Sequence, residues 1–426
     1  MAAPLSFGVA PYDSAVRPVP TLAQGLAAAA GAAAAALAVR RDARRAAPPP
    51  AEPARLEDWF APESLRRNRR FRRVSWALAV AGAPLGPGLS VVAWRTADRW
   101  APALARAAGG RYAPAGVAFG AGMALVQVAA GLPLGAARYA WGRRFGIVTQ
   151  PPSAWLADVG KATALEAGLA GGLGAALATL LHRAPRAWPL GLAAVSGAGT
   201  LALVVISPRL IEPLFQRTRP LDDPELEASV LELARRSGVP AKEVVVSDAS
   251  RRTTAPNAYV SGVGPTRRIV LFDTLLRDMP ADEVRFVVAH ELAHAARRHV
   301  RRRLLLGAAF AVPGCLALGA LVTWRTGDGP PDAALALRRA ALAAAGAAAL
   351  GTVAGPLGSW LSRAHEREAD WSAVQATGDP EAAIRTHQSL VHRALGVPDP
   401  PRWIQVLFGS HPTALERIGL ALRARA

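Results

Sequence analysis

Long stretches of this chain are apolar and almost free of charge, and each is about as long as a membrane-spanning helix. A helix needs about 20 residues to cross the hydrocarbon core of a bilayer. The stretches are Thr21–Val39, Val74–Trp94, Ala113–Ala137, Ala162–Leu181, Trp188–Ile206, Leu304–Trp324 and Ala340–Leu361. This pattern predicts a membrane α-helical protein with seven transmembrane helices. The Ala-rich first and last stretches would also suit buried helices of a soluble protein, which is the alternative for those two.

Basic residues follow the first apolar stretch rather than precede it. Arg40, Arg41, Arg44 and Arg45 come directly after the stretch, and no basic cluster stands before it. A cleaved signal peptide has the opposite arrangement. We therefore expect the first stretch to remain in the protein as a span.

The charge of the chain is strongly positive, and its distribution predicts an orientation. The formal net charge is +19, and 40 of the 50 Lys and Arg residues lie in segments 40–73, 138–161, 207–303 and 362–426. Cytoplasmic loops of membrane proteins are enriched in these residues. We expect the N-terminus outside and the C-terminus in the cytoplasm. The positive charge also suits anionic lipid headgroups, and since no nucleic-acid-binding motif is found we expect no nucleic acid partner.

Composition also bears on location and on metal chemistry. Arginine outnumbers lysine 48 to 2 in an Ala-rich chain, which indicates a GC-rich bacterial genome. The expected location is therefore the bacterial cytoplasmic membrane, as a multi-pass protein. The single cysteine, Cys315, lies in an apolar stretch and excludes an intrachain disulfide and a Cys-based metal site.

The polar segment after the fifth apolar stretch has the pattern of a small α+β unit. Asp223 and Pro224 are typical of a helix start. Three β-branched runs follow, at Glu243–Asp248, Asn257–Gly264 and Arg267–Leu276, and predict strands. A further helix is predicted to begin near Pro280, with acidic residues in its first turn.

That helix carries "HELAH", with His290 and His294 one helical turn apart. Their imidazoles project from the same face and can bind one zinc ion. Glu291 lies beside His290 and can reach a water molecule at the metal. Because few letters are fixed, the motif alone is only moderately specific for a zinc enzyme.

Zinc in a catalytic site needs a third protein ligand. His299 is nine residues beyond His290, about half a turn out of phase on an unbroken helix. No glycine interrupts this helix, so we interpret His299 as a polar residue near the helix end.

The segment "SRAHEREAD" offers better third ligands. Glu366 and Asp370 are four residues apart on a predicted helix. Glu366 could supply a carboxylate oxygen to zinc, while Asp370 accepts a hydrogen bond from a ligating imidazole. His365 and Glu368 are alternatives on other faces of the helix, and a charged solvated helix without a ligand is the plainer interpretation.

Several ordered motifs resemble the type I CAAX prenyl endopeptidase family, integral-membrane gluzincin zinc metalloproteases, and its bacterial relatives. They are "ISPRLIEPLFQRTRPL" (206–221), "PNAYVSGVG" (256–264), "HELAH" (290–294), "SRAHEREAD" (362–370) and "SHPTALERI" (410–418). The resemblance is strong from Ile206 onward and weak before Phe145. It implies seven transmembrane helices with a cytoplasmic gluzincin-type α+β zinc metalloprotease domain. Ala293 and the pair Arg367-Glu368 depart from the usual pattern without removing a ligand.

The resemblance also implies roles for individual residues. Glu366 becomes the third ligand beside His290 and His294. Asp370 becomes the acid that holds a ligating imidazole. The expected cofactor is one Zn²⁺ per chain.

Substrate contacts are expected from two further places. His411 is the candidate donor to the oxyanion, with Arg417 nearby to orient it or to hold the substrate backbone. Asn257, Ala258 and Tyr259 are expected in an edge strand on which an extended peptide pairs. The plainer interpretations are a helix-start contact for His411 and a turn for Asn257.

Glu166 is the one charged residue within the predicted spans. It could line an intramembrane chamber, as the resemblance suggests. We favour a place at the cytoplasmic rim, where it would pair with Lys161.

The expected function is a zinc-dependent integral-membrane endopeptidase that hydrolyses peptide bonds, with Glu291 as general base. Its parts are expected to be 1–206, an N-terminal membrane region with five transmembrane helices; 207–303, a cytoplasmic catalytic segment with the HExxH helix; 304–361, transmembrane helices six and seven; and 362–426, a C-terminal catalytic segment with the third ligand. Expected partners are a peptide or protein substrate, lipidated or membrane-associated, and the bilayer, with the oligomeric state left open.

Two rival functions remain at this point. A membrane quality-control metalloprotease would act on unlipidated or misfolded membrane proteins; such relatives usually have fewer spans than the seven predicted here, which disfavours this rival, while a bacterial origin makes prenyl substrates doubtful. A receptor or scaffold without activity would have no reason to keep Glu291, three ligands and Asp370.

Overall fold

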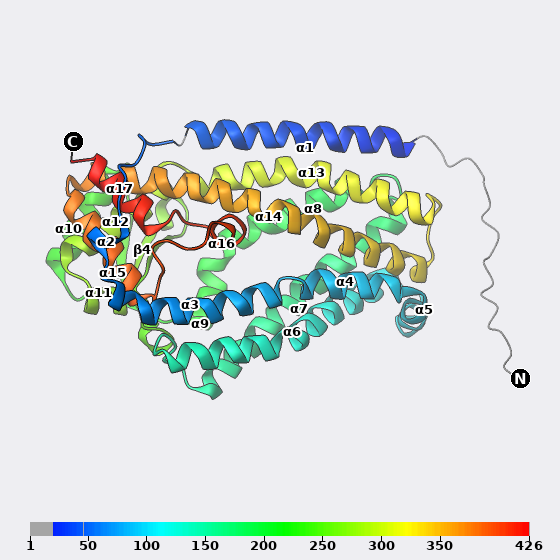
Figure 1. Ribbon diagram of the computed structural model, residues 1–426. Coiled ribbons are helices and arrows are strands. Elements are labelled where there is room, and N and C mark those ends of the chain that lie inside the picture. Colours follow the sequence, from blue (N-terminus) through cyan, green and yellow to red (C-terminus); the bar gives the residue numbers. More distant parts are fainter. Residues whose placement is uncertain (1–19, 46, 426) are drawn as a thin grey trace, which may run out of the picture.

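A computed structural model describes residues 20–45 and 47–425, with side chains from residue 27 onward. The long helices run side by side along the molecule, and the small sheet with the shorter C-terminal helices gathers at one end (Figure 1). The C-terminus lies at that end, and α1 begins at the opposite end. We refer to the end with the sheet as the polar end.

The helices and strands have the following bounds. The helices are α1 (Pro20–Arg45), α2 (Leu56–Trp59), α3 (Pro62–Gly82), α4 (Leu85–Arg95), α5 (Ala97–Ala107), α6 (Tyr112–Arg144), α7 (Pro152–Arg183), α8 (Trp188–Leu210), α9 (Glu212–Phe215), α10 (Pro224–Arg236), α11 (Asp273–Asp278), α12 (Ala281–Ala296), α13 (His299–Thr326), α14 (Ala333–Thr377), α15 (Pro380–Arg393), α16 (Arg402–Phe408) and α17 (Ala414–Arg423). The strands are β1 (Thr218–Pro220), β2 (Glu243–Ser247), β3 (Ala258–Ser261) and β4 (Arg268–Phe272).

Every predicted span lies within helical segments. Six segments of the described chain are long and apolar enough to cross a membrane: Pro62–Arg95, Tyr112–Arg144, Pro152–Arg183, Trp188–Leu210, His299–Thr326 and Ala333–Thr377. The first predicted span, Thr21–Val39, lies in α1, whose side chains before residue 27 are outside the described part. The membrane α-helical class is confirmed, with six such segments where the sequence predicts seven.

Glycine allows α6 and α7 to approach closely. A Cβ added at Gly120 would lie 2.0 Å from the carbonyl oxygen of Ala170, and one at Gly116 would lie 2.3 Å from that of Gly174. Helices in membranes gain most of their association energy from such close backbone packing, since lipid already surrounds apolar side chains. The spacing of Gly116 and Gly120 therefore holds this helix pair together.

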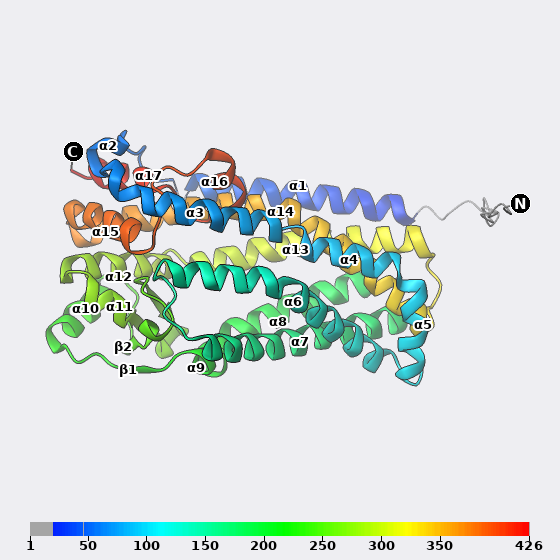
Figure 2. The same ribbon diagram turned by 60° about the horizontal axis from the view of Figure 1, so that its bottom comes forward.

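Helix α1 lies along α13 (Figures 1 and 2). Gly31 of α1 faces Pro313 of α13, where an added Cβ would lie 3.0 Å from the proline Cβ. Near the polar end, Val39 and Ala43 of α1 are buried with Leu361 of α14. The first helix of the chain thereby reaches the segments that carry the metal motifs.

The sheet has the strand order β1-β2-β4-β3. β2 and β4 pair in parallel, with Val245 opposite Val270, while β3 pairs antiparallel to β4. The two central strands are almost wholly apolar and buried, as strands covered on both faces are. β3 is an edge strand, as the sequence predicts.

The polar end has its own apolar core. Phe286 of α12, Ile269 of β4 and Ile418 of α17 are buried in one cluster that also includes α10 and α15. The predicted helix start is confirmed, because the Asp223 side chain accepts a hydrogen bond from the backbone of Leu226. α14 extends from the membrane helices into this core without a break.

Candidate metal centre

Helix α12 presents the two histidines of the motif. Pro280 precedes its first turn, and Asp282 and Glu283 in that turn suit the helix dipole. Val288 and Leu292 are buried in the core of the polar end, which fixes the rotation of the helix. This rotation directs His290 and His294 toward α14.

Three ligand atoms converge between α12 and α14. His290 Nε2 and His294 Nε2 are 3.1 Å apart. Glu366 Oε2 lies 3.3 Å from His290 Nε2, and Glu366 Oε1 lies 3.3 Å from His294 Nε2. Ligands about 2.0–2.1 Å from a tetrahedral zinc ion are separated by about 3.3 Å. Each of these separations is close to that edge length, with a different oxygen of Glu366 beside each imidazole.

The surroundings of His290 and Glu366 support the same metal site. Asp370 Oδ1 lies 2.9 Å from His290 Nδ1, so the proton on that nitrogen points to the carboxylate and Nε2 is the nitrogen that would bind a metal. Glu366 Oε2 is buried and accepts no hydrogen bond from any described residue. Two imidazole lone pairs and a buried carboxylate oxygen thus face one small volume, an arrangement that a divalent cation balances.

Arg417 of α17 holds Asp370 in place. The guanidinium donates two hydrogen bonds to the carboxylate, at 2.7 and 2.6 Å; the Asp370 side chain is buried and the Arg417 side chain is mostly covered. Burial lowers the pKa of His290, but the nearby carboxylates of Asp370 and Glu366 outweigh it and raise that pKa to about 10 without a metal. The sequence prediction places Arg417 toward His411 or the substrate, whereas its hydrogen bonds in the structure end on Asp370.

Glu291 and His411 border the same volume. Glu291 is half-buried and makes no hydrogen bond or ion pair with the described residues, and burial raises the pKa of its carboxyl group. His411 Nε2 lies 3.4 Å from Glu366 Oε2, and its side chain is 59% exposed. The structure therefore brings both predicted groups next to the ligand triad.

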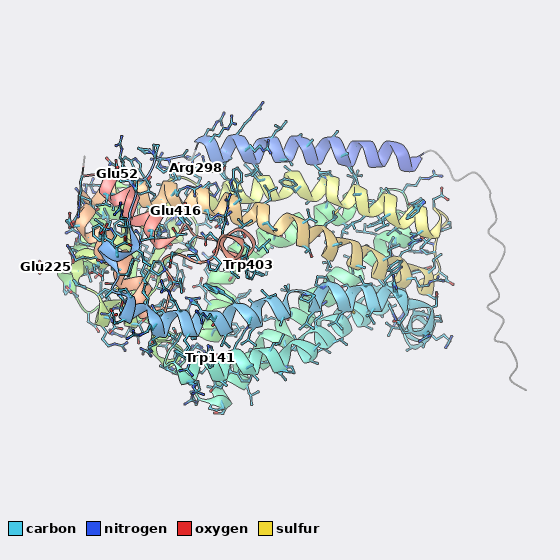
Figure 3. All side chains as sticks on the ribbon, in the orientation of Figure 1. Glu52, Trp141, Glu225, Arg298, Trp403 and Glu416 are labelled. Carbon is cyan, nitrogen blue, oxygen red and sulfur yellow. The ribbon has the colours of Figure 1, made fainter. Side chains whose placement is uncertain are left out.

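The sequence argument for His299 is wrong in one respect, the unbroken helix. The helix breaks after α12 at Arg298, which adopts the left-handed conformation with φ 56°, and α13 begins at His299 (Figure 3 labels Arg298). His299 is a polar residue at the first position of α13, and it is fully buried. The sequence argument assumes an unbroken helix because no glycine is present, but an arginine makes the turn here.

His299 supports a ligand instead of being one. It lies on the far side of His294, at 2.8 Å between the two Nδ1 atoms, and its Nε2 lies 3.0 Å from Glu368 Oε2. With His299 Nε2–H donating to the carboxylate, its Nδ1 accepts from His294 Nδ1–H. Each histidine of the motif therefore has a partner that directs its Nε2 lone pair toward the metal position.

The chain of contacts continues to α1. Arg302 binds Glu368 at 2.8 Å and Asp42 at 2.9 Å. His365 stacks on His299 with ring centroids 4.3 Å apart and lies 2.8 Å from Asp42. His365 and Glu368, which the sequence offers as alternative ligands, thus form the surroundings of His294. Asp42 is missed by sequence reasoning, although an acid among the arginines of segment 40–45 is an available signal.

The predicted substrate strand lies at the sheet edge, but Tyr259 does not point its hydroxyl to an open space. That hydroxyl accepts from Gln216 and donates to Glu212 at 3.4 Å, and burial raises its pKa to about 12. Ala258 is buried and Asn257 is exposed. Only the backbone of β3 and Asn257 remain available for a peptide.

The predicted pairing of Glu166 with Lys161 is wrong. Lys161 lies 3.4 Å from Asp158 and donates to the Leu214 carbonyl. Glu166 is exposed in α7 and forms no ion pair with the described residues. Asp158 is nearer because it lies one helical turn before Lys161.

Comparison with protein families matches both halves of the chain. Residues 220–426 match "Peptidase family M48", and residues 53–217 match "CAAX prenyl protease N-terminal, five membrane helices". The crystal structure of Saccharomyces mikatae Ste24p has a similar fold, with a TM-score of 0.75 and 21% identity, covering 95% of this chain and 99% of that one.

Individual relatives have similar sequences over parts of the chain. "Uncharacterized metalloprotease YhfN" of Bacillus subtilis is 33% identical over 56% of this chain. "CAAX prenyl protease 1" of Saccharomyces cerevisiae is 43% identical over 24%, and "Protease HtpX homolog" of Acaryochloris marina is 30% identical over 55%. The matches span 57% of the first protein, 22% of the second and 83% of the third. These similarities, together with the metal geometry, show that the chain belongs to peptidase family M48.

Proposed function

We propose that this protein is a zinc-dependent endopeptidase of the membrane, with His290, His294 and Glu366 as the metal ligands. The observation that carries the proposal is the convergence of their ligand atoms, all within 4.8 Å of one another. One Zn²⁺ would suit two imidazole nitrogens and a carboxylate oxygen, and it would leave a position open for reaction. Bound there, zinc supplies Lewis-acid chemistry, which polarises the scissile carbonyl and makes water more acidic.

The residues of the chain supply the proton transfers. Glu291 takes a proton from the attacking water as the oxygen bonds to the carbonyl carbon, and delivers it to the leaving amine as the peptide bond breaks. Its raised pKa suits this exchange, because a carboxyl group that is too acidic would hold the proton too weakly to pass it on. Asp370 and His299 keep the two ligand imidazoles oriented during the reaction.

His411 and strand β3 are proposed to hold the substrate. His411 lies beside Glu366 with an exposed side chain, a suitable position for donating a hydrogen bond to the developing oxyanion. The free edge of β3, with Asn257 at its start, would pair with an extended peptide. Arg417 would contribute through Asp370.

The proposed substrates are peptides or proteins at the membrane, including lipidated ones. The similarity to a CAAX prenyl protease motivates the lipid, while the similarity to an HtpX homolog motivates a test with unlipidated chains. We further propose the bacterial cytoplasmic membrane as the location, with the metal centre facing the cytoplasm, because 40 of the 50 basic residues lie in the segments assigned to that side. The four-part division drawn from the sequence remains part of this proposal, with α14 joining its last two parts.

The experiment compares the wild type with Glu291→Gln in reconstituted membranes, using one peptide sequence with and without a prenyl group. Glu291→Gln should retain one zinc per chain, measured by elemental analysis, and lose about 10²–10⁴-fold in cleavage rate. A Glu225→Gln variant, changed at an exposed position of α10, serves as the matched control and should cleave normally.

Each result separates the possible functions. Normal cleavage by Glu291→Gln would reject the proposed base. Faster cleavage of the unprenylated peptide would favour a general membrane protease over a prenyl-directed one. A wild-type protein that binds no stoichiometric zinc would reject the metal centre itself.

A further inference from the structure

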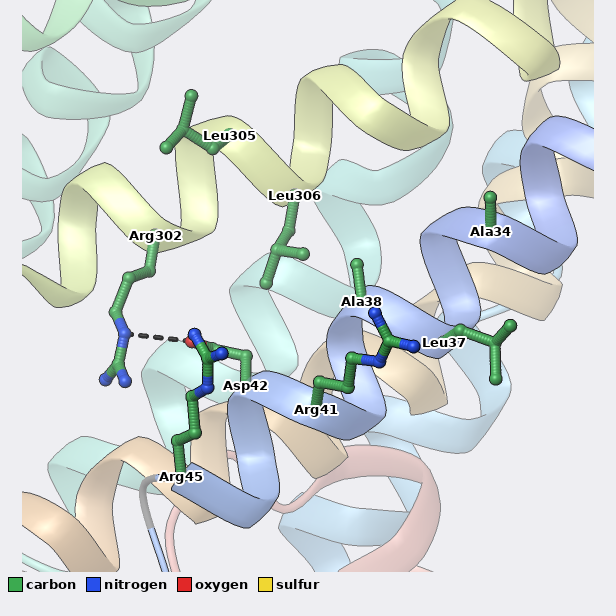
Figure 4. A pocket seen from close by; sticks show the side chains of 9 residues that line it. All are labelled: Ala34, Leu37, Ala38, Arg41, Asp42, Arg45, Arg302, Leu305 and Leu306. Atoms are coloured by element: carbon green, nitrogen blue, oxygen red, sulfur yellow. Dashed lines mark ion pairs between the residues drawn. The ribbon is translucent and has the colours of Figure 1, made fainter.

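A cavity of about 450 Å³ lies between α1 and α13, outside the metal centre. Its apolar wall consists of Ala34, Leu37 and Ala38 from α1 and Leu305 and Leu306 from α13 (Figure 4). Leu37 and Leu305 are more than half exposed, so the wall is accessible from outside the helix pair.

The other wall of this cavity is polar and contains three arginines. Arg41, Asp42 and Arg45 of α1 and Arg302 of α13 form this wall, and Asp42 pairs with Arg302 (Figure 4). The polar residues lie on one side because both helices change from apolar to charged at the same level, after Val39 in α1 and before Leu304 in α13. That change marks the boundary between hydrocarbon and headgroups.

Two of the three arginines have no acidic partner among the described residues. Arg302 is bound by Asp42 at 2.9 Å and by Glu368 at 2.8 Å. Arg41 and Arg45 form no ion pair with any residue that the structure describes, and both are exposed. A cationic pair at the headgroup level, directly beside an apolar wall, matches a molecule that has both an anionic group and a hydrocarbon chain.

We propose that one acidic phospholipid binds in this cavity, with its phosphate at Arg41 and Arg45 and an acyl chain along Leu37, Leu305 and Leu306. Guanidinium groups bind phosphate oxygens through paired, charge-assisted hydrogen bonds. Neutral lipids lack the net negative charge that the two arginines require, so the cavity selects acidic headgroups. Lipid binding at this site does not require the proposed peptidase activity.

The site also touches the surroundings of the metal centre. Asp42 and Arg302 line the cavity and belong to the chain of contacts that ends at His294. A lipid bound here would cover the exposed side of these contacts between Asp42 and His294. It would also hold α1 against α13.

The test measures lipid binding by native mass spectrometry on the purified full chain with equal amounts of palmitoyl-oleoyl phosphatidylglycerol and phosphatidylcholine. The wild type should retain one phosphatidylglycerol in preference. Arg41→Gln/Arg45→Gln should bind it about a hundredfold more weakly, because two charge-assisted contacts to the phosphate are lost and each is worth about tenfold. Arg40→Gln/Arg44→Gln removes the same charge from neighbouring positions of α1 that do not line the cavity, and should bind within about threefold of wild type, because exposed charges that do not contact the lipid are screened by salt.

Three results would overturn the proposal. Equal losses in the two double variants would indicate a general surface charge effect. Equal retention of phosphatidylcholine would exclude headgroup selection, and displacement of the lipid by millimolar inorganic phosphate would indicate a phosphate site without an acyl chain. Thermal unfolding of both variants checks that they are folded.

Discussion

Asp370 contributes to both metal binding and folding, and replacing it by asparagine, alone and together with a change at Arg417, separates the two contributions. Its carboxylate lies 2.9 Å from His290 Nδ1 and accepts two hydrogen bonds from Arg417. Only 2% of the Asp370 side chain and 14% of the Arg417 side chain are exposed. An asparagine at this position would leave the guanidinium buried without its counter-charge.

Two magnitudes follow from these contacts. Removing one partner of a buried ion pair costs about 3–5 kcal/mol of folding free energy. Losing the charged acceptor on a ligating imidazole lowers metal affinity by about 10–100-fold. Asp370→Asn should therefore show both losses, whereas Asp370→Asn/Arg417→Met should regain most of the stability and keep the weak zinc binding.

Zinc affinity is measured by competition with a chromophoric chelator in detergent, and stability by thermal unfolding of the chelator-treated protein. The single and double variants must be compared under the same conditions because bound zinc itself adds stability. Zinc affinity of Asp370→Asn within twofold of wild type would refute the role given to this carboxylate. Recovery of zinc affinity in the double variant would show that the folding defect, rather than the imidazole contact, weakens the site.

Three further predictions concern other contacts. His299→Phe keeps the stacking on His365 but removes the Nδ1 partner of His294. Zinc affinity should therefore fall by about tenfold or more in the same competition assay. An unchanged zinc affinity would contradict the role of His299. Gly120→Ala should lower the unfolding free energy by about 1–3 kcal/mol, because its Cβ would lie 2.0 Å from a carbonyl oxygen, while Gly122→Ala, with no atom within 4 Å, is the control that should unfold normally. Burial and the charge of Arg417 lower the pKa of His387 to about 3; below its ordinary value of about 6.5 the unfolded chain takes up a proton that the folded protein does not. His387 should therefore contribute a fall in stability of about 1.4 kcal/mol per pH unit from pH 6.5 downward, and His387→Gln should lack this part of the slope in thermal unfolding at pH 7 and pH 5.

The membrane helices and the central strands were predictable because each has a strong local pattern. Apolar runs such as Leu304–Trp324 can only be buried in protein or lipid, and Glu243–Ser247 is β-branched and later covered on both faces. The third predicted strand was only half right. β4 ends at Phe272 and the rest of the run forms α11, because an apolar run of this length fits either structure.

The surroundings of His294 could not be predicted, because they depend on a backbone turn without a sequence signal. Arg298 in the left-handed region costs about 1–2 kcal/mol relative to a helical residue, and local preference alone favours a continuous helix. The packing of His299 against Glu368 and His365 offsets that cost. Asp42 is likewise distant in sequence, and only the packing of α1 on α13 and α14 places it beside these residues.

Helix α14 connects the bilayer mechanically to the metal centre. It has 45 residues and is about 67 Å long, with Pro356 near its middle, a membrane span at one end and Glu366 toward the other. Pivoting near its middle by about 4° would move Glu366, about 16 Å from the pivot, by about 1 Å. Metal–ligand distances tolerate only about 0.2 Å, and helix tilt follows the thickness of the surrounding lipid. A change in membrane thickness that tilts α14 would thus change the position of Glu366 relative to His290 and His294.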